Sequence, residues 1–286
     1  MPTISVILPA KNEAASLPAL ILPLRQLLPE AEILVVDDGS SDGTGDLAET
    51  LGARVIRHPY TMGNGAAVKN GARAARGEIL VFMDADGQHD PKDIPRLLEA
   101  FSQGYKMVVG ARQADTHSSL GRRFANQIYN RLASAMTGYR IEDLTSGFRA
   151  ADAECFRKFL YLLPNGFSYP TTSTMAFFRA GFPVAYVPIR ARRRHQDSRS
   201  HVRLLRDGIR FFVIIFKIGA LFSPMRLFLP VSAFTFAIGL IYYAYTFFMW
   251  GRLTNMSVIL FLGSLFIFLM GIISEQISSL HYRLHE

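Results

Sequence analysis

Two long uncharged apolar segments near the end of the chain constrain its fold more than any other feature. Residues 227–250 contain no charged side chain, and residues 258–274 form a second such run that extends to residue 279 past Glu275. A helix needs about 20 apolar residues to cross the hydrocarbon core of a bilayer. We therefore predict two transmembrane helices, with a buried helical hairpin as the alternative.

The basic residues indicate how these two helices are oriented. Only Arg252 lies between them, whereas five basic residues precede the first one: Arg203, Arg206, Arg210, Lys217 and Arg226. Segments rich in Lys and Arg remain in the cytoplasm. We therefore expect a multi-pass protein of the cell inner membrane, with both termini and everything before residue 227 in the cytoplasm.

The formal net charge of +8 is concentrated between Arg190 and Arg226. Residues 202–222 place cations on one side of a helix and Leu, Ile and Phe on the other, which is typical of an amphipathic helix in a membrane interface. An ordinary surface helix is the alternative. The clustering favours an anionic lipid surface as a partner, and we expect no nucleic acid to bind. A homo-oligomer is left open.

Short apolar runs alternate with segments of helical spacing over the first 110 residues. The runs cover residues 4–8, 33–36, 54–56, 79–83 and 107–109, and the helical segments cover residues 46–51, 66–76 and 91–103, followed by 121–138 and 172–180. Near-continuous Val and Ile runs indicate strands buried on both faces. We predict an α/β fold with a doubly wound, mostly parallel sheet. Its domain covers residues 1–195, a basic loop and interface helix cover 196–226, and a membrane hairpin covers 227–286.

An acidic turn follows the fourth predicted strand. Asp84-Ala85-Asp86 stands directly after residues 79–83, and Gln88 follows two residues later. Ligand sites in open α/β sheets form at the carboxyl ends of strands. Two carboxylates and an amide oxygen suit a hard cation such as Mg²⁺ or Mn²⁺, and a diphosphate can complete its coordination. A solvated acidic turn is the alternative.

Two more predicted strands end in polar loops at the same edge. One is Asp37-Asp38-Gly39-Ser40, where a carboxylate can accept hydrogen bonds from a nucleotide base, and the other is the loop that begins at Pro9. Residues 38–49 also match the ligand positions of an EF-hand calcium loop. We reject that assignment, because an EF-hand loop follows a helix and this segment follows a strand. Gly63-Asn64-Gly65 is a partial dinucleotide fingerprint without its third glycine, so we expect a flexible turn there.

Five motifs occur in a fixed order along the chain. They are Pro9-x-x-Asn12-Glu13, Val36-Asp37-Asp38-Gly39-Ser40-x-Asp42-Gly43-Thr44, Asp84-Ala85-Asp86-x-Gln88-His89-x-Pro91, Gly110-x-Arg112 and Ser146-Gly147-Phe148-Arg149. This set resembles the dolichol-phosphate mannose synthase group of inverting glycosyltransferases with the GT-A fold. The match covers about two thirds of the chain. The hydrophobic tail resembles the bacterial polyprenyl-phosphate branch of that group.

The resemblance implies a role for each matching position. The donor nucleotide is held at Pro9, Lys11, Glu13, Val36, Asp38, Asp84, Ala85 and Asp86. The metal is held at Asp86 and Gln88, to which the reasoning from donor chemistry adds Asp84, and Arg112 contacts phosphate. Lys11 departs from the family, because an aromatic residue is frequent there.

The basic loop of the family matches residues 193–201 in two registers. One register places its Ser-Lys pair at Ser198-Arg199 and the other at Ser200-His201. We expect Arg199 and His201 to face phosphate. The alternative is that this loop only holds the chain to anionic lipid.

The resemblance implies metal-dependent transfer of a sugar from GDP-mannose or a UDP-hexose to dolichyl or undecaprenyl phosphate, with inversion. A phosphate monoester is largely dianionic at neutral pH, because its second pKa is about 6, so it needs no strong base. Asp143 could orient the acceptor, or act as a base toward a hydroxyl acceptor. Arg112, and either Arg122 or Arg123, are candidates to lie between the acceptor phosphate and the donor diphosphate. Arg122 and Arg123 could instead form a solvated helix face.

Two other functions compete with this one. The first is a hydroxyl-directed or polysaccharide-forming glycosyltransferase. Such enzymes carry a Gln-x-x-Arg-Trp element, and this alternative is disfavoured because the only tryptophan here, Trp250, lies inside a predicted membrane helix. The second is a non-catalytic membrane scaffold that binds nucleotide sugar. Retention of Asp84, Asp86 and Gln88 together argues against a decayed site.

Overall fold

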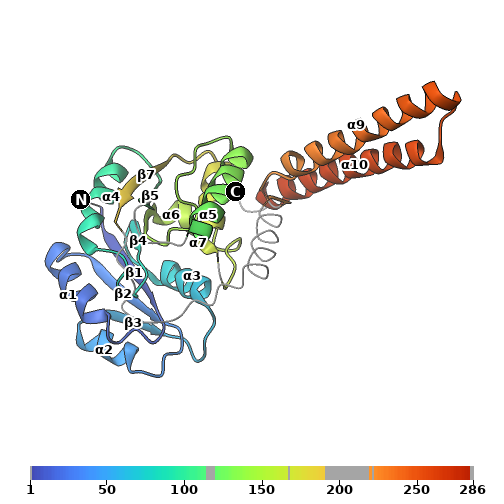
Figure 1. The fold of residues 1–286 in the computed structure, drawn as a ribbon. Helices are drawn as coiled ribbons and strands as arrows, with labels where there is room; N and C mark the ends of the chain where they lie inside the picture. The colour runs from blue at the N-terminus through green and yellow to red at the C-terminus, as the bar shows by residue number, and fades with distance from the viewer. Residues whose placement is uncertain (1, 114–119, 167, 191–218, 221, 284–286) are drawn as a thin grey trace. The chain divides into compact units, whose positions relative to one another are not determined.

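A computed structural model describes residues 2–113, 120–166, 168–190, 219–220 and 222–283 (Figure 1). The fold divides into an N-terminal α/β unit and a C-terminal helical unit, which are described separately. Most of the predicted interface helix, residues 202–222, lies outside the described residues. That helix and the predicted domain boundaries therefore remain predictions.

The α/β unit is built on a sheet of seven strands in the order β3-β2-β1-β4-β6-β5-β7. The strands are β1 (Ile4–Ala10), β2 (Glu32–Asp37), β3 (Arg54–Arg57), β4 (Ile79–Phe82), β5 (Met107–Arg112), β6 (Arg149–Asp152) and β7 (Val184–Ile189). Strand β1 pairs in parallel with β2 and β4, and β5 pairs in parallel with β7. Only β6 is antiparallel to its two neighbours. The predicted α/β, mostly parallel fold is confirmed.

Helices connect the strands and cover the sheet (Figure 1). They are α1 (Leu17–Leu27), α2 (Thr44–Thr50), α3 (Asn64–Ala74), η1 (Pro91–Asp93), α4 (Ile94–Ser102), α5 (Leu120–Thr137), α6 (Ala153–Arg157) and α7 (Tyr169–Arg179). All four residues of β4 are buried, as expected of a central strand with both faces covered. The five predicted strands and the predicted helices of this unit match described elements.

Helix α3 packs unusually close to its neighbours. A Cβ atom on Gly71 would lie 2.5 Å from Cγ2 of Ile7 on β1, and a Cβ atom on Gly65 would lie 2.0 Å from the Pro164 carbonyl oxygen. In the first turn of α3, Gly65 N donates to the Gly166 carbonyl at 3.2 Å and Ala66 N donates to the Asn165 carbonyl at 2.9 Å. The glycines at residues 63–65 therefore allow close backbone packing, a role that the sequence analysis did not assign.

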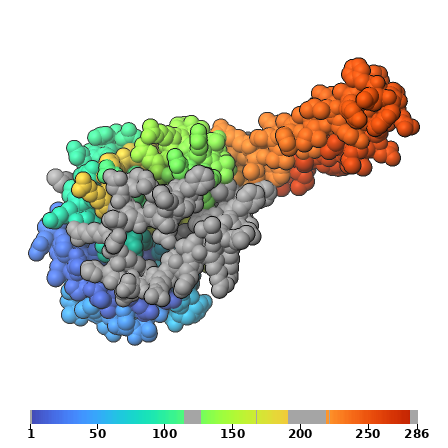
Figure 2. Space-filling model, viewed as in Figure 1, coloured from blue at the N-terminus to red at the C-terminus, as the bar shows by residue number. Residues whose placement is uncertain are grey.

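The helical unit contains α9 (Pro224–Trp250) and α10 (Asn255–Arg283). Both are long and apolar enough to cross a membrane, by length and composition. Their side chains pack against each other (Figure 2), and Ser232 Oγ donates to the Ser264 carbonyl at 2.8 Å. Large apolar side chains point outward, including Phe248 at 85% and Ile241 at 72% exposed. A hairpin of this kind suits an apolar solvent.

A carboxylate inside the hairpin has a defined partner. Glu275 of α10 accepts a hydrogen bond from Met225 N, in the first turn of α9, at 3.2 Å. The first N–H groups of a helix have no partner within the helix and favour a negative charge. This contact explains why one acidic residue is tolerated in an otherwise uncharged stretch.

Candidate functional site

Polar loops follow four strands at one edge of the sheet. Strands β1, β2 and β4 are parallel, and β5 runs in the same direction because β6 is antiparallel to both β4 and β5. Their carboxyl ends therefore deliver the motifs that begin at Pro9, Asp37 and Asp84, together with Arg112, to a single edge. These motifs therefore lie at one edge of the sheet, as expected from the sequence.

The loops after β1 and β2 are bound to each other. Asn12 N donates to Ser40 Oγ, and Ser41 N donates to Asn12 Oδ1, both at 2.9 Å. Glu13 N donates to Thr44 Oγ1 at 3.0 Å. These contacts place the predicted nucleotide-binding positions of the first loop beside those of the second.

Asp38 lies at the centre of a buried network, with its side chain 6% exposed. Its Oδ1 accepts from His58 Nδ1 and from Met62 N, both at 2.7 Å, and its Oδ2 accepts from Gly63 N at 2.9 Å. His58 Nε2 faces Asn70 Nδ2 at 2.8 Å, which assigns the proton on the ring to Nδ1. Asp38 therefore fixes the loop before α3, and its predicted contact with a base stays a prediction.

These contacts also set the charge of Asp38. Burial, the largest influence, raises the pKa of the carboxyl group, but hydrogen bonds from His58, Met62 and Gly63 outweigh burial. The net result is a lowered pKa. Asp38 is therefore ionised at neutral pH.

The acidic turn after β4 presents three oxygen-bearing side chains. Asp84, Asp86 and Gln88 are each partly exposed, and Asp86 Oδ1 accepts from Gln88 N at 3.1 Å. Gly87 between them has a φ of 75°, which a glycine adopts without strain. The buried Ala85 is held by Ser16 Oγ, which donates to its carbonyl at 2.6 Å.

The donor chemistry of this turn fits a hard divalent cation. Two carboxylates and an amide oxygen are ligands that Mg²⁺ and Mn²⁺ prefer, and such ions usually take further ligands from substrate phosphates and water. Over the described part of the chain, no group of three His, Cys, Asp or Glu side chains could hold a metal ion. Asp84, Asp86 and Gln88 would hold the ion, and a diphosphate could complete its coordination.

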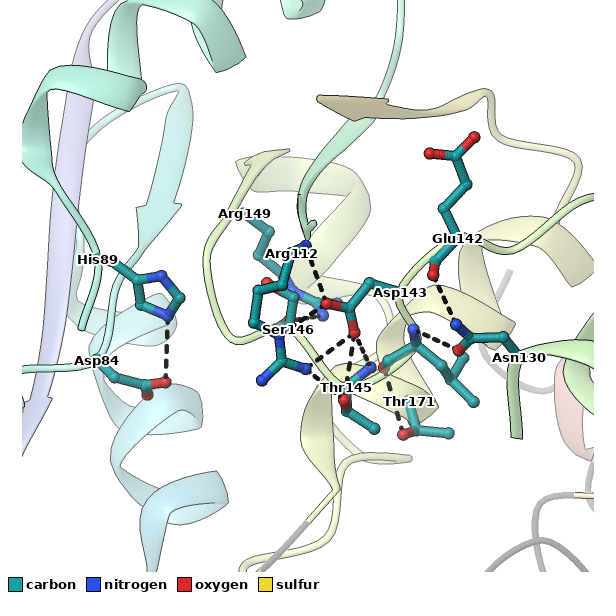
Figure 3. Close-up of polar contacts among 11 residues, drawn as sticks. Asp84, His89, Arg112, Asn130, Glu142, Asp143, Thr145, Ser146, Arg149 and Thr171 are labelled. Carbon is teal, nitrogen blue, oxygen red and sulfur yellow. Dashed lines mark hydrogen bonds and ion pairs between the residues drawn. The ribbon is translucent and has the colours of Figure 1, made fainter. Parts of the chain in front are cut away.

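His89 is a site residue that the sequence analysis assigned no role. Its Nε2 lies 3.9 Å from Asp84 Oδ2 (Figure 3). Its ring stacks on Phe148 at 5.1 Å between centroids. Burial lowers the pKa of His89 to about 4, so the ring is neutral at physiological pH. The sequence signal that could have identified His89 is its place in the acidic motif, two residues before Pro91.

Arg112 is held by a bidentate pair. Its Nε and Nη2 donate to the two carboxylate oxygens of Asp143 at 2.8 and 3.0 Å, and Nη2 also donates to Thr145 Oγ1 at 2.6 Å (Figure 3). Burial, the largest influence, lowers the pKa of Arg112, but the Asp143 contacts and the charge of Asp84 raise it overall. Arg112 is a fixed cation that interacts with the Asp84 charge.

The same pair defines what Asp143 can do. Burial raises the pKa of Asp143 most strongly, yet the hydrogen bonds and charge of Arg112 outweigh it, so the pKa is lowered. A carboxylate that is ionised and bound on both oxygens is a weak base. Asp143 orients Arg112, and its predicted role toward the acceptor stays a prediction.

The remaining predicted cations are described less fully. Arg123 lies in α5, and its backbone alone is described. Arg199 and His201 lie outside the described residues, so their predicted contacts with phosphate stay predictions.

Two families match this chain. Glycosyl transferase family 2 matches residues 5–160, and the GtrB C-terminal hairpin matches residues 223–280. A glucosyl-3-phosphoglycerate synthase from Mycobacterium tuberculosis, solved with Mn²⁺ and UDP-glucose, superposes with a TM-score of 0.60 at 25% identity. The superposition covers 76% of this chain and 78% of that one.

Similar proteins of known name extend the comparison. Glycosyltransferase AglJ of Haloferax volcanii is 29% identical over 98% of this chain and 96% of its own length. The undecaprenyl-phosphate mannosyltransferase of Micrococcus luteus is 36% identical, and the polyprenol monophosphomannose synthase of Mycolicibacterium smegmatis is 33% identical. Each matches 64% of this chain, and the match spans 81% and 75% of those proteins, respectively.

These matches confirm the resemblance to the polyprenyl-phosphate glycosyltransferases and the GT-A fold. They cover both the sheet with its polar edge and the two apolar helices. The chain is therefore a glycosyltransferase that belongs to glycosyl transferase family 2.

Proposed function

We propose that this enzyme transfers a hexose from GDP-mannose or a UDP-hexose to a polyprenyl phosphate, dolichyl or undecaprenyl, with inversion and with the help of Mg²⁺ or Mn²⁺. The observation that carries the proposal is the combination of two features in one chain. One is the oxygen-donor turn at Asp84, Asp86 and Gln88 with the fixed cation Arg112. The other is a pair of helices long enough to cross a membrane.

The chemistry is a single displacement at the anomeric carbon. A phosphate oxygen of the acceptor forms the new bond to this carbon while the bond to the donor's diphosphate oxygen breaks, so the nucleoside diphosphate leaves with the electron pair. Asp84, Asp86 and Gln88 would hold a metal ion, which would neutralise charge on that leaving group. Pro9, Lys11, Glu13, Val36, Asp38 and Ala85 are the proposed contacts to the rest of the donor nucleotide.

Two phosphate-bearing substrates repel each other unless cations lie close to both. Arg112 is suited to this task because Asp143 and Thr145 fix its guanidinium plane. Arg123, Arg199 and His201 are the proposed further contacts to the acceptor phosphate.

The competing functions fit the site less well. A hydroxyl acceptor needs a base, and the candidate Asp143 is bound to Arg112 through both oxygens. A soluble acceptor also gives no reason for two apolar helices, whereas a lipid phosphate lies at the membrane surface. The non-catalytic alternative conflicts with the membership of the chain in a glycosyltransferase family.

The first prediction concerns the metal. Asp86→Asn should lower sugar transfer by about 100-fold or more, and a chelator should do the same to the wild type, because the leaving diphosphate loses its charge partner. Asp46→Asn is a matched control, since that side chain is 84% exposed on α2 and pairs with Arg57. Transfer is measured as release of nucleoside diphosphate. Full activity in chelator would exclude the metal.

The second prediction separates a positioning role of Asp143 from a basic one. Arg112→Ala and Asp143→Asn should each lower transfer by about 10-fold, equivalent to about 1.4 kcal/mol, while nucleotide binding stays nearly intact. Arg123→Ala should have a smaller effect. The control is Arg96→Ala, because Arg96 of α4 also pairs with an aspartate, Asp93 of η1, and its side chain is 49% exposed. If Asp143→Asn cost 100-fold more than Arg112→Ala, Asp143 would be the base of a hydroxyl-directed enzyme.

The third prediction concerns orientation in the membrane. We propose that the catalytic domain and both termini are cytoplasmic, so the turn between α9 and α10 faces the opposite side. A cysteine introduced at Asn255 in a Cys155→Ser background should react with an impermeant maleimide added outside spheroplasts. One introduced at the exposed Lys11 should react only after lysis. Labelling of residue 255 from the cytoplasmic side alone would contradict the two-span hairpin.

A further inference from the structure

The segment Ser146-Gly147-Phe148-Arg149 lies directly against the acidic turn. A Cβ atom on Gly147 would lie 2.6 Å from Asp84 Oδ2 and 3.2 Å from Asp84 Cγ. Real Cβ atoms essentially never approach other heavy atoms within 3.0 Å. Gly147 does not have a positive φ. Its lack of a side chain therefore provides space for the Asp84 carboxylate and is not needed for the backbone conformation.

Two buried side chains hold this turn in place. Tyr169 OH donates to the Gly147 carbonyl at 3.0 Å, and Arg149 Nη2 donates to the Ser146 carbonyl. The other end of the Arg149 guanidinium binds the first turns of α7, where Nη1 donates to the Pro170 carbonyl at 3.0 Å and to Ser173 Oγ at 2.7 Å. The turn is therefore tied to α7 on both sides of Gly147.

Arg149 is an unusual residue for this task. It is fully buried, and its guanidinium lies 5.7 Å from the centroid of the Tyr169 ring. Its pairing with Phe82 of β4 and Val109 of β5 places it in the interior of the sheet. Its hydrogen-bond acceptors in the described residues are carbonyl, hydroxyl and thioether groups. Burial lowers the pKa of Arg149. Among the described residues no carboxylate contacts the Arg149 guanidinium, and burying a cation in this way is costly.

A second contact of Asp84 involves the same segment. Phe148 stacks on His89, whose Nε2 lies 3.9 Å from Asp84 Oδ2, too far for a direct hydrogen bond. Asp84 Oδ2 therefore lies close to both the Gly147 backbone and the buried His89 ring, and both of these contact residues 146–149. Figure 3 shows Asp84 beside His89, with Arg149 and Ser146 near the Arg112 pair.

We propose that Gly147, anchored by Tyr169 and Arg149, is a positioning residue that fixes the Asp84 carboxylate in its orientation for the metal and donor diphosphate. The inference rests on the proposed function, since it takes Asp84 as a ligand in that site. Outer groups that orient a ligating carboxylate commonly affect metal affinity by 10-fold or more. Because the turn is tied to α7, an added methyl group at residue 147 displaces Asp84 instead of the turn.

The test measures metal binding directly on the full chain in detergent. Mn²⁺ is titrated in the presence of UDP or GDP, whichever the wild type binds, and free Mn²⁺ is followed by electron paramagnetic resonance. We expect Gly147→Ala to raise the half-saturating Mn²⁺ concentration by at least about 10-fold. Gly166→Ala is the matched control, because a Cβ there meets nothing within 4 Å and should leave Mn²⁺ binding unchanged.

A second variant tests whether the anchored turn is the cause. Tyr169→Phe removes the donor to the Gly147 carbonyl, and it should weaken Mn²⁺ binding by about 3-fold on its own. In the double variant the turn is free to move away from Asp84. Adding Gly147→Ala to Tyr169→Phe should therefore weaken Mn²⁺ binding clearly less than Gly147→Ala does in the wild type. This non-additivity would not arise if Gly147→Ala only destabilised the fold.

The outcomes distinguish the inference from the function on which it rests. If the wild type shows no Mn²⁺-dependent nucleotide binding, the proposed function fails and the inference fails with it. If the wild type binds but Gly147→Ala binds Mn²⁺ equally well, the positioning role alone is wrong. Additive effects of Gly147→Ala and Tyr169→Phe would also overturn it. If Gly147→Ala does not fold, unchanged Mn²⁺ binding by Tyr169→Phe would overturn the positioning role.

Discussion

Parallel pairing of β1 with β2 and β4 is the constraint on which the site depends. It brings three polar loops to one edge of a sheet whose interior is apolar, so charged groups gather where the chain can leave them partly solvated. The antiparallel strand β6 then brings residues 146–149 against the acidic turn. Three of the charged side chains at this edge have defined neighbours: Asp38 has His58, Arg112 has Asp143, and Asp84 has His89 and Gly147.

The sequence predicted the strands that have a strong physical signal and missed those that do not. Runs such as residues 79–83 are apolar throughout because both faces of a central strand are covered. Strand β6 reads Arg-Ala-Ala-Asp, with little β propensity, and only the tertiary pairing with β4 and β5 makes it a strand. Helix α1 was missed because Pro23 lies inside its helical pattern.

The sequence also indicated which residues reach the site, but it could not indicate their partners. Placement at a strand end follows from local pattern, and so Asp84, Asp86 and Arg112 could be named in advance. The partners of Asp38 and Arg112 lie 20 and 31 residues away along the chain, in loops whose approach is fixed only by the folded sheet. Gly147 and Tyr169 are further cases, because the value of a missing side chain or a buried hydroxyl depends on contacts that local pattern does not encode.

The central claim is that the acceptor is a lipid phosphate, and the chemical identity of the product tests it most directly. The purified protein, in detergent with Mn²⁺ or Mg²⁺, would be given GDP- and UDP-sugars, a polyprenyl phosphate and a water-soluble sugar acceptor, and the products would be analysed by mass spectrometry. We expect a polyprenyl phosphate that has gained one hexose, with the anomeric configuration opposite to that of the donor. Preferential glycosylation of the soluble hydroxyl acceptor, with no hexosylated lipid phosphate, would contradict it.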